Sequence, residues 1–147
     1  MNALYPAILS GCVAATRDFY VSLLGLRVDF DSDWAVYLSA PTDDALKLAI
    51  VDRGHDSVPE PFRAAAAGVL ISVEVDDVDK TWARAVGLGA PVRQPLRDEP
   101  FGQRHFMVSD PNGLLVDVIT TIPFSDDFMA EHAAAFSSPA FSSPAAG

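Results

Sequence analysis

The sequence has a single cysteine, Cys12, and no long apolar run. One cysteine excludes an intramolecular disulfide framework, which fits a reducing compartment. No segment approaches the ~20 consecutive apolar residues that a transmembrane helix needs, so we expect no membrane span. The opening segment "MNALYPAILSG" has no basic group ahead of an apolar stretch, so no secretory leader is expected. These absences together favour a soluble, cytoplasmic protein.

Basic side chains are also scarce, with 10 lysines and arginines against 20 acidic residues. The resulting net charge of −10 repels phosphate backbones, so a nucleic-acid partner is not expected. The same charge would attract cationic ligands at long range, although acidic surfaces are common among soluble proteins. Half of the 147 residues are hydrophobic, which is enough for one domain or for two small repeats that share a core.

The first half of the chain has the pattern of a strand, a helix and three further strands. Apolar residues recur at helical spacing from Val13 to Leu24, and Gly25 suits the C-terminal cap of that helix. The strands are expected over residues 4–10, 27–33, 34–40 and 45–52, with a turn at 41–44.

The same pattern restarts after a connecting segment with two prolines, "RGHDSVPEPFRAAAAG". Asp76 or Asp77 suits the N-terminal cap of a second helix, which glycines end. The segment "APVRQPLRDEPFG" is predicted to be mostly loop, with a short strand near Val92. Strands are expected over residues 68–75, 104–110 and 114–120, the last two joined by the tight turn "DPNG".

The two halves overlay at an offset of about 65 residues, which matches Val13 with Val78 and Thr16 with Thr81. An internal duplication therefore predicts an α+β fold of two tandem βαβββ modules. Module one is expected over residues 1–53, the linker over 54–67 and module two over 68–122, together forming one domain. Residues 123–147 are expected to form a short helix capped by Ser125 and a mobile Ser/Pro/Ala-rich tail.

The paired modules, the segment "DFYVSLLGL" and the segment "DEPFGQRHFMVSDPNGLLVDV" resemble the vicinal oxygen chelate superfamily over residues 2–121. That group includes glyoxalase I, extradiol dioxygenases, fosfomycin resistance enzymes and bleomycin-binding resistance proteins. The resemblance implies that each module curls into a half-barrel and that a curled mixed sheet surrounds a ligand cavity. It also implies a homodimer. It does not fix the function, because one fold hosts many chemistries.

Metal-binding members of that superfamily place histidine or glutamate on the first and last strands of each module. The matching positions here hold Tyr5, then Lys47, Leu48 or Ala49, then Leu70, and finally Asp117. One carboxylate does not hold a divalent metal with useful affinity, and His55 and His132 lie in the linker and the tail. We therefore expect neither a metal nor another cofactor.

Period-two geometry predicts which strand side chains face the cavity. The resemblance implies that Phe101, in the segment "EPFG", forms part of the rim. If the DPNG turn spans about five residues, His105 lies opposite Asp117. The aromatic and apolar side chains expected in the cavity suit a flat ring system, and the carboxylates there would favour a cationic group. Other interpretations stay open: Trp34 and Tyr37 as sheet packing, Glu74 as a solvated side chain, and His105 with Asp117 as a structural pair. The predicted ligand-binding residues are Tyr5, Trp34, Tyr37, Leu70, Glu74, Phe101, His105, Met107 and Asp117.

Three functions remain as hypotheses. The first is a metal-free binding protein that sequesters a small organic molecule, such as a cationic aromatic antibiotic. The second is a metal-free lyase or isomerase in which His105, oriented by Asp117, acts as a general base. The third is a metal-dependent glyoxalase-like or dioxygenase-like enzyme with unusual ligands. The lost metal ligands favour the first.

Overall fold

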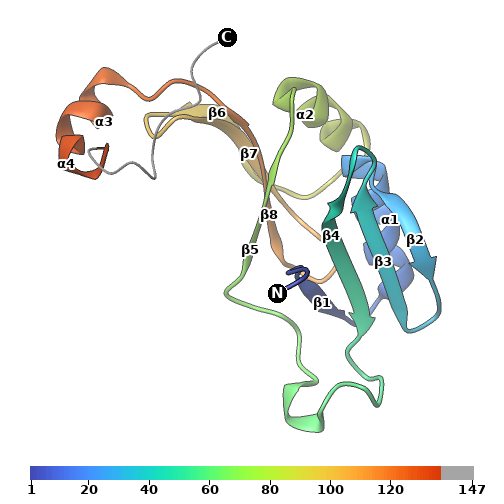
Figure 1. The fold of residues 1–147 in the computed structure, drawn as a ribbon. Coiled ribbons are helices and arrows are strands. Elements are labelled where there is room, and N and C mark those ends of the chain that lie inside the picture. The colour runs from blue at the N-terminus through green and yellow to red at the C-terminus, as the bar shows by residue number, and fades with distance from the viewer. Residues whose placement is uncertain (137–147) are drawn as a thin grey trace.

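A computed structural model describes residues 1–136 of the chain (Figure 1). The Ser/Pro/Ala-rich segment that the sequence predicts to be mobile lies almost wholly outside this range. Among the described residues, none of the helices has the length and apolar character needed to cross a membrane. The elements are β1 (Ala7–Ser10), α1 (Val13–Leu24), β2 (Arg27–Asp31), β3 (Ala35–Ala40), β4 (Asp43–Asp52), a 3-10 turn (Glu60–Phe62), β5 (Leu70–Glu74), α2 (Val78–Gly87), β6 (Val92–Glu99), β7 (Gln103–Ser109), β8 (Leu115–Thr121), α3 (Asp126–Glu131) and α4 (Ala133–Phe136).

The strands form two four-stranded sheets with the same topology. The first has the order β1-β4-β3-β2 and the second has the order β5-β8-β7-β6. In each sheet the first strand of the module pairs in parallel with the last, and the other pairs are antiparallel. The predicted α+β architecture of two βαβββ modules is confirmed, with two separate curled sheets that do not close around a cavity.

The helices have the predicted caps, and their first turns share one hydrogen bond. The Asp77 side chain accepts a hydrogen bond from the Lys80 amide and caps α2, while Gly25 ends α1 in the left-handed conformation with φ of 69°. Thr16 donates its hydroxyl proton to the carbonyl of Cys12, and Thr81 donates its own to the carbonyl of Asp77. The same bond at overlaid positions supports the internal duplication.

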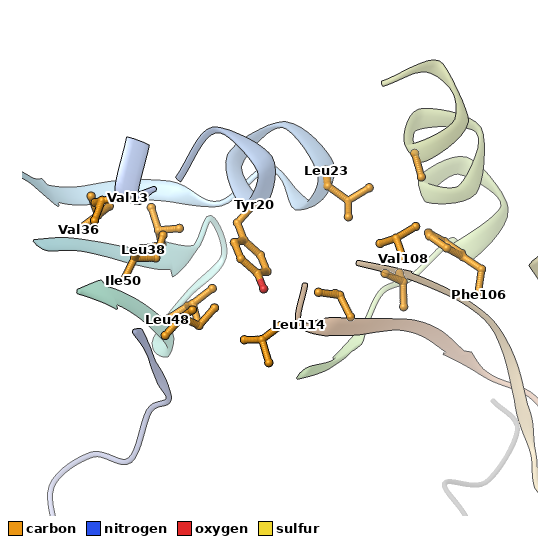
Figure 2. Close-up of a cluster of buried hydrophobic side chains, with 14 of the residues drawn as sticks. Val13, Tyr20, Leu23, Val36, Leu38, Leu48, Ile50, Phe106, Val108 and Leu114 are labelled. Atoms are coloured by element: carbon orange, nitrogen blue, oxygen red, sulfur yellow. The ribbon is translucent and has the colours of Figure 1, made fainter. Parts of the chain in front are cut away.

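The core lies between the two helices and the sheet faces that they cover (Figure 2). Alternate residues of the strands point toward the helices, which places Val36 and Leu38 of β3 in this core together with Phe106 and Val108 of β7. Tyr20 of α1 is fully buried and lies between the side chains of the two modules. The modules therefore share one hydrophobic core.

The turn after β7 contacts module one through the buried Asp110. The Asp110 carboxylate accepts hydrogen bonds from the backbone amides of Asn112 and Leu114, at 2.8 and 2.9 Å, and so closes the DPNG turn. The hydroxyl of Tyr20 donates to the same carboxylate across the core, at 3.2 Å. Burial first, and then the neighbouring Asp110 charge, raise the pKa of Tyr20, so its hydroxyl stays protonated and remains a donor.

One strand, β6, is longer than the sequence analysis predicted. The segment predicted to be mostly loop contains β6, which runs from Val92 to Glu99. Its pairing with β7 shifts register between Gln94 and Arg97, around Pro95, because proline cannot donate to the ladder. This irregularity disrupts the alternation that identifies a strand in a sequence.

Candidate functional site

Each sheet has one face on the core and one face turned away from the helices. On the second sheet, His105 and Met107 of β7 lie on the outward face, because Phe106 and Val108 between and beside them are buried in the core. Asp117 of β8 pairs with Met107 and lies on the same outward face. The sequence therefore predicted correctly that these three side chains share a face.

The residue opposite His105 is Ile119, so the predicted direct pairing of His105 with Asp117 is wrong. The turn spans residues 110–114 and pairs Ser109 with Leu115, which places Asp117 two residues away along β8. The two side chains nevertheless meet along the diagonal, with His105 Nδ1 2.8 Å from Asp117 Oδ1. Both are buried, and only 3% of His105 is exposed.

The second ring nitrogen of His105 is also occupied. His105 Nε2 lies 2.8 Å from the amide nitrogen of Gln94 and 3.2 Å from Glu99 Oε1. Gln94 and Glu99 belong to β6. The sequence analysis predicted most of this segment to be a loop, so it did not identify them as partners of His105. Because both nitrogens have partners and the ring is buried, His105 is placed to hold β6, β7 and β8 together.

Glu99 connects this pair to the surface, where its carboxylate also binds Arg97. The hydrogen bond from His105, followed by the one from Arg97, holds the pKa of Glu99 below its usual value. A carboxylate with a lowered pKa in the folded state stabilises the fold at pH values above its ordinary pKa. That contribution is lost as the pH falls through the folded-state value.

We therefore predict that acid weakens the wild-type fold more than it weakens Glu99→Gln. Between about pH 5 and pH 3, around the ordinary glutamate pKa, the urea midpoint of the wild type should fall more steeply than that of the variant. Asp56→Asn is the matched control, because the Asp56 side chain is fully exposed and forms only a surface ion pair with Arg63. Parallel pH profiles for the wild type and Glu99→Gln would contradict the prediction.

The outward face of the first sheet carries a group of aromatic rings. Phe30 and Tyr37 are opposite each other on β2 and β3, with ring centroids 5.9 Å apart, and Tyr5 meets Tyr37 edge-on at 6.3 Å. The three rings are 48%, 38% and 41% exposed for Phe30, Tyr37 and Tyr5 respectively. Phe30 was not among the predicted residues, because its pairing with Tyr37 depends on the register of β2 and β3.

Trp34 lies apart from these rings. It precedes β3 and stacks on His55 of the linker, with ring centroids 3.9 Å apart and an angle of 11° between the planes. The predicted ligand residues thus fall into three places: Tyr5 and Tyr37 on the first sheet, Trp34 at the linker, and the other six on or beside the second sheet. Leu70 and Glu74, at the two ends of β5, are both exposed.

Phe101 lies in the turn between β6 and β7 and connects the site to the C-terminal helices. Its ring meets His105 edge-on at 6.1 Å and Phe128 of α3 at 6.5 Å. The backbone amides of Ile122 and Ser125 bond to the carbonyls of Gly102 and Pro100. Gly102 has φ of 83°, and a side chain there would approach Ile122 and Phe124, so this close docking requires glycine. In Figure 1, α3 and α4 accordingly lie at the end of module two, far from β1–β4.

The residues at the metal positions of the resemblance do not form a donor set. Within residues 1–136 there is no group of three or more histidine, cysteine, aspartate or glutamate side chains that could hold a metal ion. Asp117 is engaged by His105, and Leu70 has no donor atom. In residues 1–136 these positions therefore do not fit the metal that some members of that superfamily bind.

Two open hollows lie at the edges of the sheets. One, of about 410 Å³, is bounded by Gly68 to Leu70 and by the turn at Gly113 to Leu115. The other, of about 420 Å³, lies at the start of α1, beside Asp33 and Asp52. Of the predicted ligand residues, only Leu70 borders either hollow, so neither of them by itself is the predicted pocket.

Comparison with known families gives one match. The model of the glyoxalase/bleomycin resistance protein/dioxygenase superfamily matches residues 4–118. An uncharacterized protein of Mycobacterium bovis is 29% identical over 124 residues, which cover 76% of this chain and 78% of the relative. Uncharacterized relatives from two strains of Mycobacterium tuberculosis match at the same identity and cover 69% of their own length.

Solved structures with the same fold include proteins of different described activities. TioX from Micromonospora sp. ML1 superposes with a TM-score of 0.64 at 21% identity, covering 83% of this chain and 100% of its own. The antibiotic-binding protein TnmS3 from Streptomyces sp. CB03234 also gives 0.64 at 21% identity, covering 82% and 96%. A lactoylglutathione lyase from Agrobacterium tumefaciens gives 0.63 at 22% identity, covering 82% and 94%. At these identities the likeness establishes the fold alone.

Proposed function

Because the chain belongs to the glyoxalase/bleomycin resistance protein/dioxygenase superfamily, we propose that it binds a small, flat organic molecule without using a metal. The observation that carries the proposal is the group of Tyr5, Phe30 and Tyr37 on a sheet face turned away from the core. Aromatic rings left this exposed offer stacking surface to a planar ligand. The described antibiotic binding of TnmS3 is consistent with this function on the same fold.

In this proposal the outward face of the second sheet contacts the other side of the same ligand. Met107 and Leu70 are its apolar members, Phe101 forms its rim, and Glu74 is an exposed carboxylate with neither a hydrogen bond nor an ion pair within residues 1–136. A carboxylate beside apolar surface favours a cationic group. In this proposal Asp117 and His105 stiffen the wall, and the ligand contacts the residues around them.

The pocket is completed by a second copy of the chain. The two sheets of one chain are separate, and each leaves an apolar outward face exposed. In a homodimer, the first sheet of one copy can face the second sheet of its partner, which would bring both walls around one ligand. The resemblance that predicts the dimer therefore also explains why neither wall forms a closed cavity within one chain.

The test is a ligand screen by thermal shift, followed by calorimetry, with polycyclic aromatic antibiotics that are cationic, anionic or uncharged. We expect stabilisation by at least one compound and a loss of about tenfold or more in affinity for Tyr37→Ala, because a stacking ring is removed. Phe62→Ala is the matched control, since Phe62 is exposed on the linker. If no compound stabilises the protein, or if both variants lose affinity equally, the proposed site is wrong.

A second candidate is a metal-free lyase or isomerase. The bond between His105 and Asp117 favours it, since such a carboxylate fixes the tautomer of a general base. The occupied Nε2 atom argues against it, because that nitrogen would have to release Gln94 and Glu99 to reach a substrate. Turnover of a bound carbonyl compound that His105→Gln abolishes without weakening binding would favour the enzyme.

A further inference from the structure

Lys47 lies on the outward face of the first sheet, in the row next to that of Tyr37 and Phe30. It lies on β4 opposite Ser39, and the next β4 residue on that face, Ala49, lies opposite Tyr37. Leu48, between them, is buried in the core, so Lys47 points to the same side as Tyr37. On its other side, the pairing of Ala7 with Ala49 brings the segment of Tyr5 alongside.

Lys47 differs from the neighbouring cation in how its charge is balanced. Arg27 lies in the same row across the sheet, but it is held by Asp29 at 2.9 Å and by Asp44 at 2.6 Å. The side chain of Lys47 has neither a hydrogen bond nor an ion pair with any of residues 1–136. Its weak attraction to Asp29 is the smallest of the influences that lower the pKa of that carboxyl. Its ammonium group is therefore available to a ligand.

A lysine side chain without an acidic partner is notable here, because most of the protein surface is negatively charged. The chain carries a net charge of −10, so an anionic molecule approaching most of the surface is repelled. A lysine beside aromatic rings provides a local exception: the rings can stack on a flat ligand while the ammonium meets an acidic group at its edge. An uncharged ligand would use the rings and leave the ammonium without a partner.

We propose that the first sheet recognises an aromatic anion, a planar ring system bearing a carboxylate, sulfonate or ionised phenol, with Lys47 as the residue that selects the charge. This rests on the proposed function and specifies its ligand: the acidic group lies at Lys47 and the rings lie on Tyr37 and its neighbours. Where the ligand also has a cationic group, that group would lie at the second sheet, toward Glu74.

The test uses two fluorescent probes that differ by one charged group. The anion is 8-anilinonaphthalene-1-sulfonate, and its uncharged counterpart is N-phenyl-1-naphthylamine. We expect Lys47→Gln to weaken binding of the sulfonate by about tenfold or more, the typical worth of a charge-assisted hydrogen bond, and to leave binding of the amine unchanged. The wild-type affinity for the sulfonate should also fall with added salt, and the variant should lose that dependence.

Lys80→Gln is the matched control, because Lys80 is the only other lysine and lies on α2, away from this face. Tyr37→Ala should weaken both probes, which would locate them at the aromatic face. If Lys47→Gln and Lys80→Gln bind the sulfonate equally well while Tyr37→Ala does not, the proposed function stands and the charge selection is wrong. If the wild type binds neither probe, both proposals are wrong.

Discussion

Replacing His105 with alanine should lower the free energy of unfolding by about 3–5 kcal/mol near neutral pH. The change leaves the Asp117 carboxylate buried, 4% exposed, without the imidazole that lies 2.8 Å from it. It also removes the partner that Gln94 and Glu99 share across β6 and β7. Urea unfolding followed by circular dichroism measures the loss.

His55→Ala is the matched control for the His105 variant. His55 is half-buried and stacks on Trp34, so its removal should cost about 1 kcal/mol or less. The double variant His105→Ala with Asp117→Ala should regain part of the loss, because it leaves no unpaired charge in the site. A loss below about 1 kcal/mol for His105→Ala would mean that water replaces the imidazole and that the pair does not hold the sheet together.

The second large effect is expected at Asp110. Asp110→Ala should cost about 3 kcal/mol or more, because two backbone amides and the Tyr20 hydroxyl lose their acceptor inside the protein. Tyr20→Phe removes only one of these bonds and should cost about 1–2 kcal/mol. Because the modules still share one core around Tyr20, we expect Asp110→Ala to lower the midpoint of unfolding without splitting the transition.

Asp98→Ala controls for the loss of a carboxylate. Asp98 pairs with Arg104 on the exposed surface, so its removal should cost about 1 kcal/mol or less. If Asp110→Ala is as mild as Asp98→Ala, the hydrogen bonds of the Asp110 carboxylate do not stabilise the turn and its contact with Tyr20. Two separate transitions for Asp110→Ala would instead indicate that the shared core around Tyr20 is too weak to couple them.

The sequence predicted the architecture because its signals were local and repeated. The Gly25 and Asp77 caps, the helical spacing of α1 and the DPNG turn each act within a few residues, and the structure confirms them. The predictions were wrong where they depended on which strand residues pair with each other. Pro95 obscured β6, and the partner of His105 was misplaced by two residues because register depends on where the turn closes.

The limits of the site prediction have the same cause. Gln94 and Glu99 could not be assigned to His105 without β6, and Phe128 could not be placed beside Phe101 without the docking at Gly102. Lys47 was considered only as a metal ligand, for which it is unsuitable. Its significance comes from Tyr5 and Tyr37 on neighbouring strands, which no local pattern brings together.

The pairing of first and last strands has a consequence for synthesis on the ribosome. Ala7 pairs with Ala49 and Leu70 with Leu115, so each module's first strand waits for a partner made about 40 residues later. At a translation rate of roughly 5–20 residues per second, the emerging chain carries β1 and the apolar side of α1 unpaired for several seconds. During that interval the nascent module exposes a bare strand edge, and this is when chaperones have access to it.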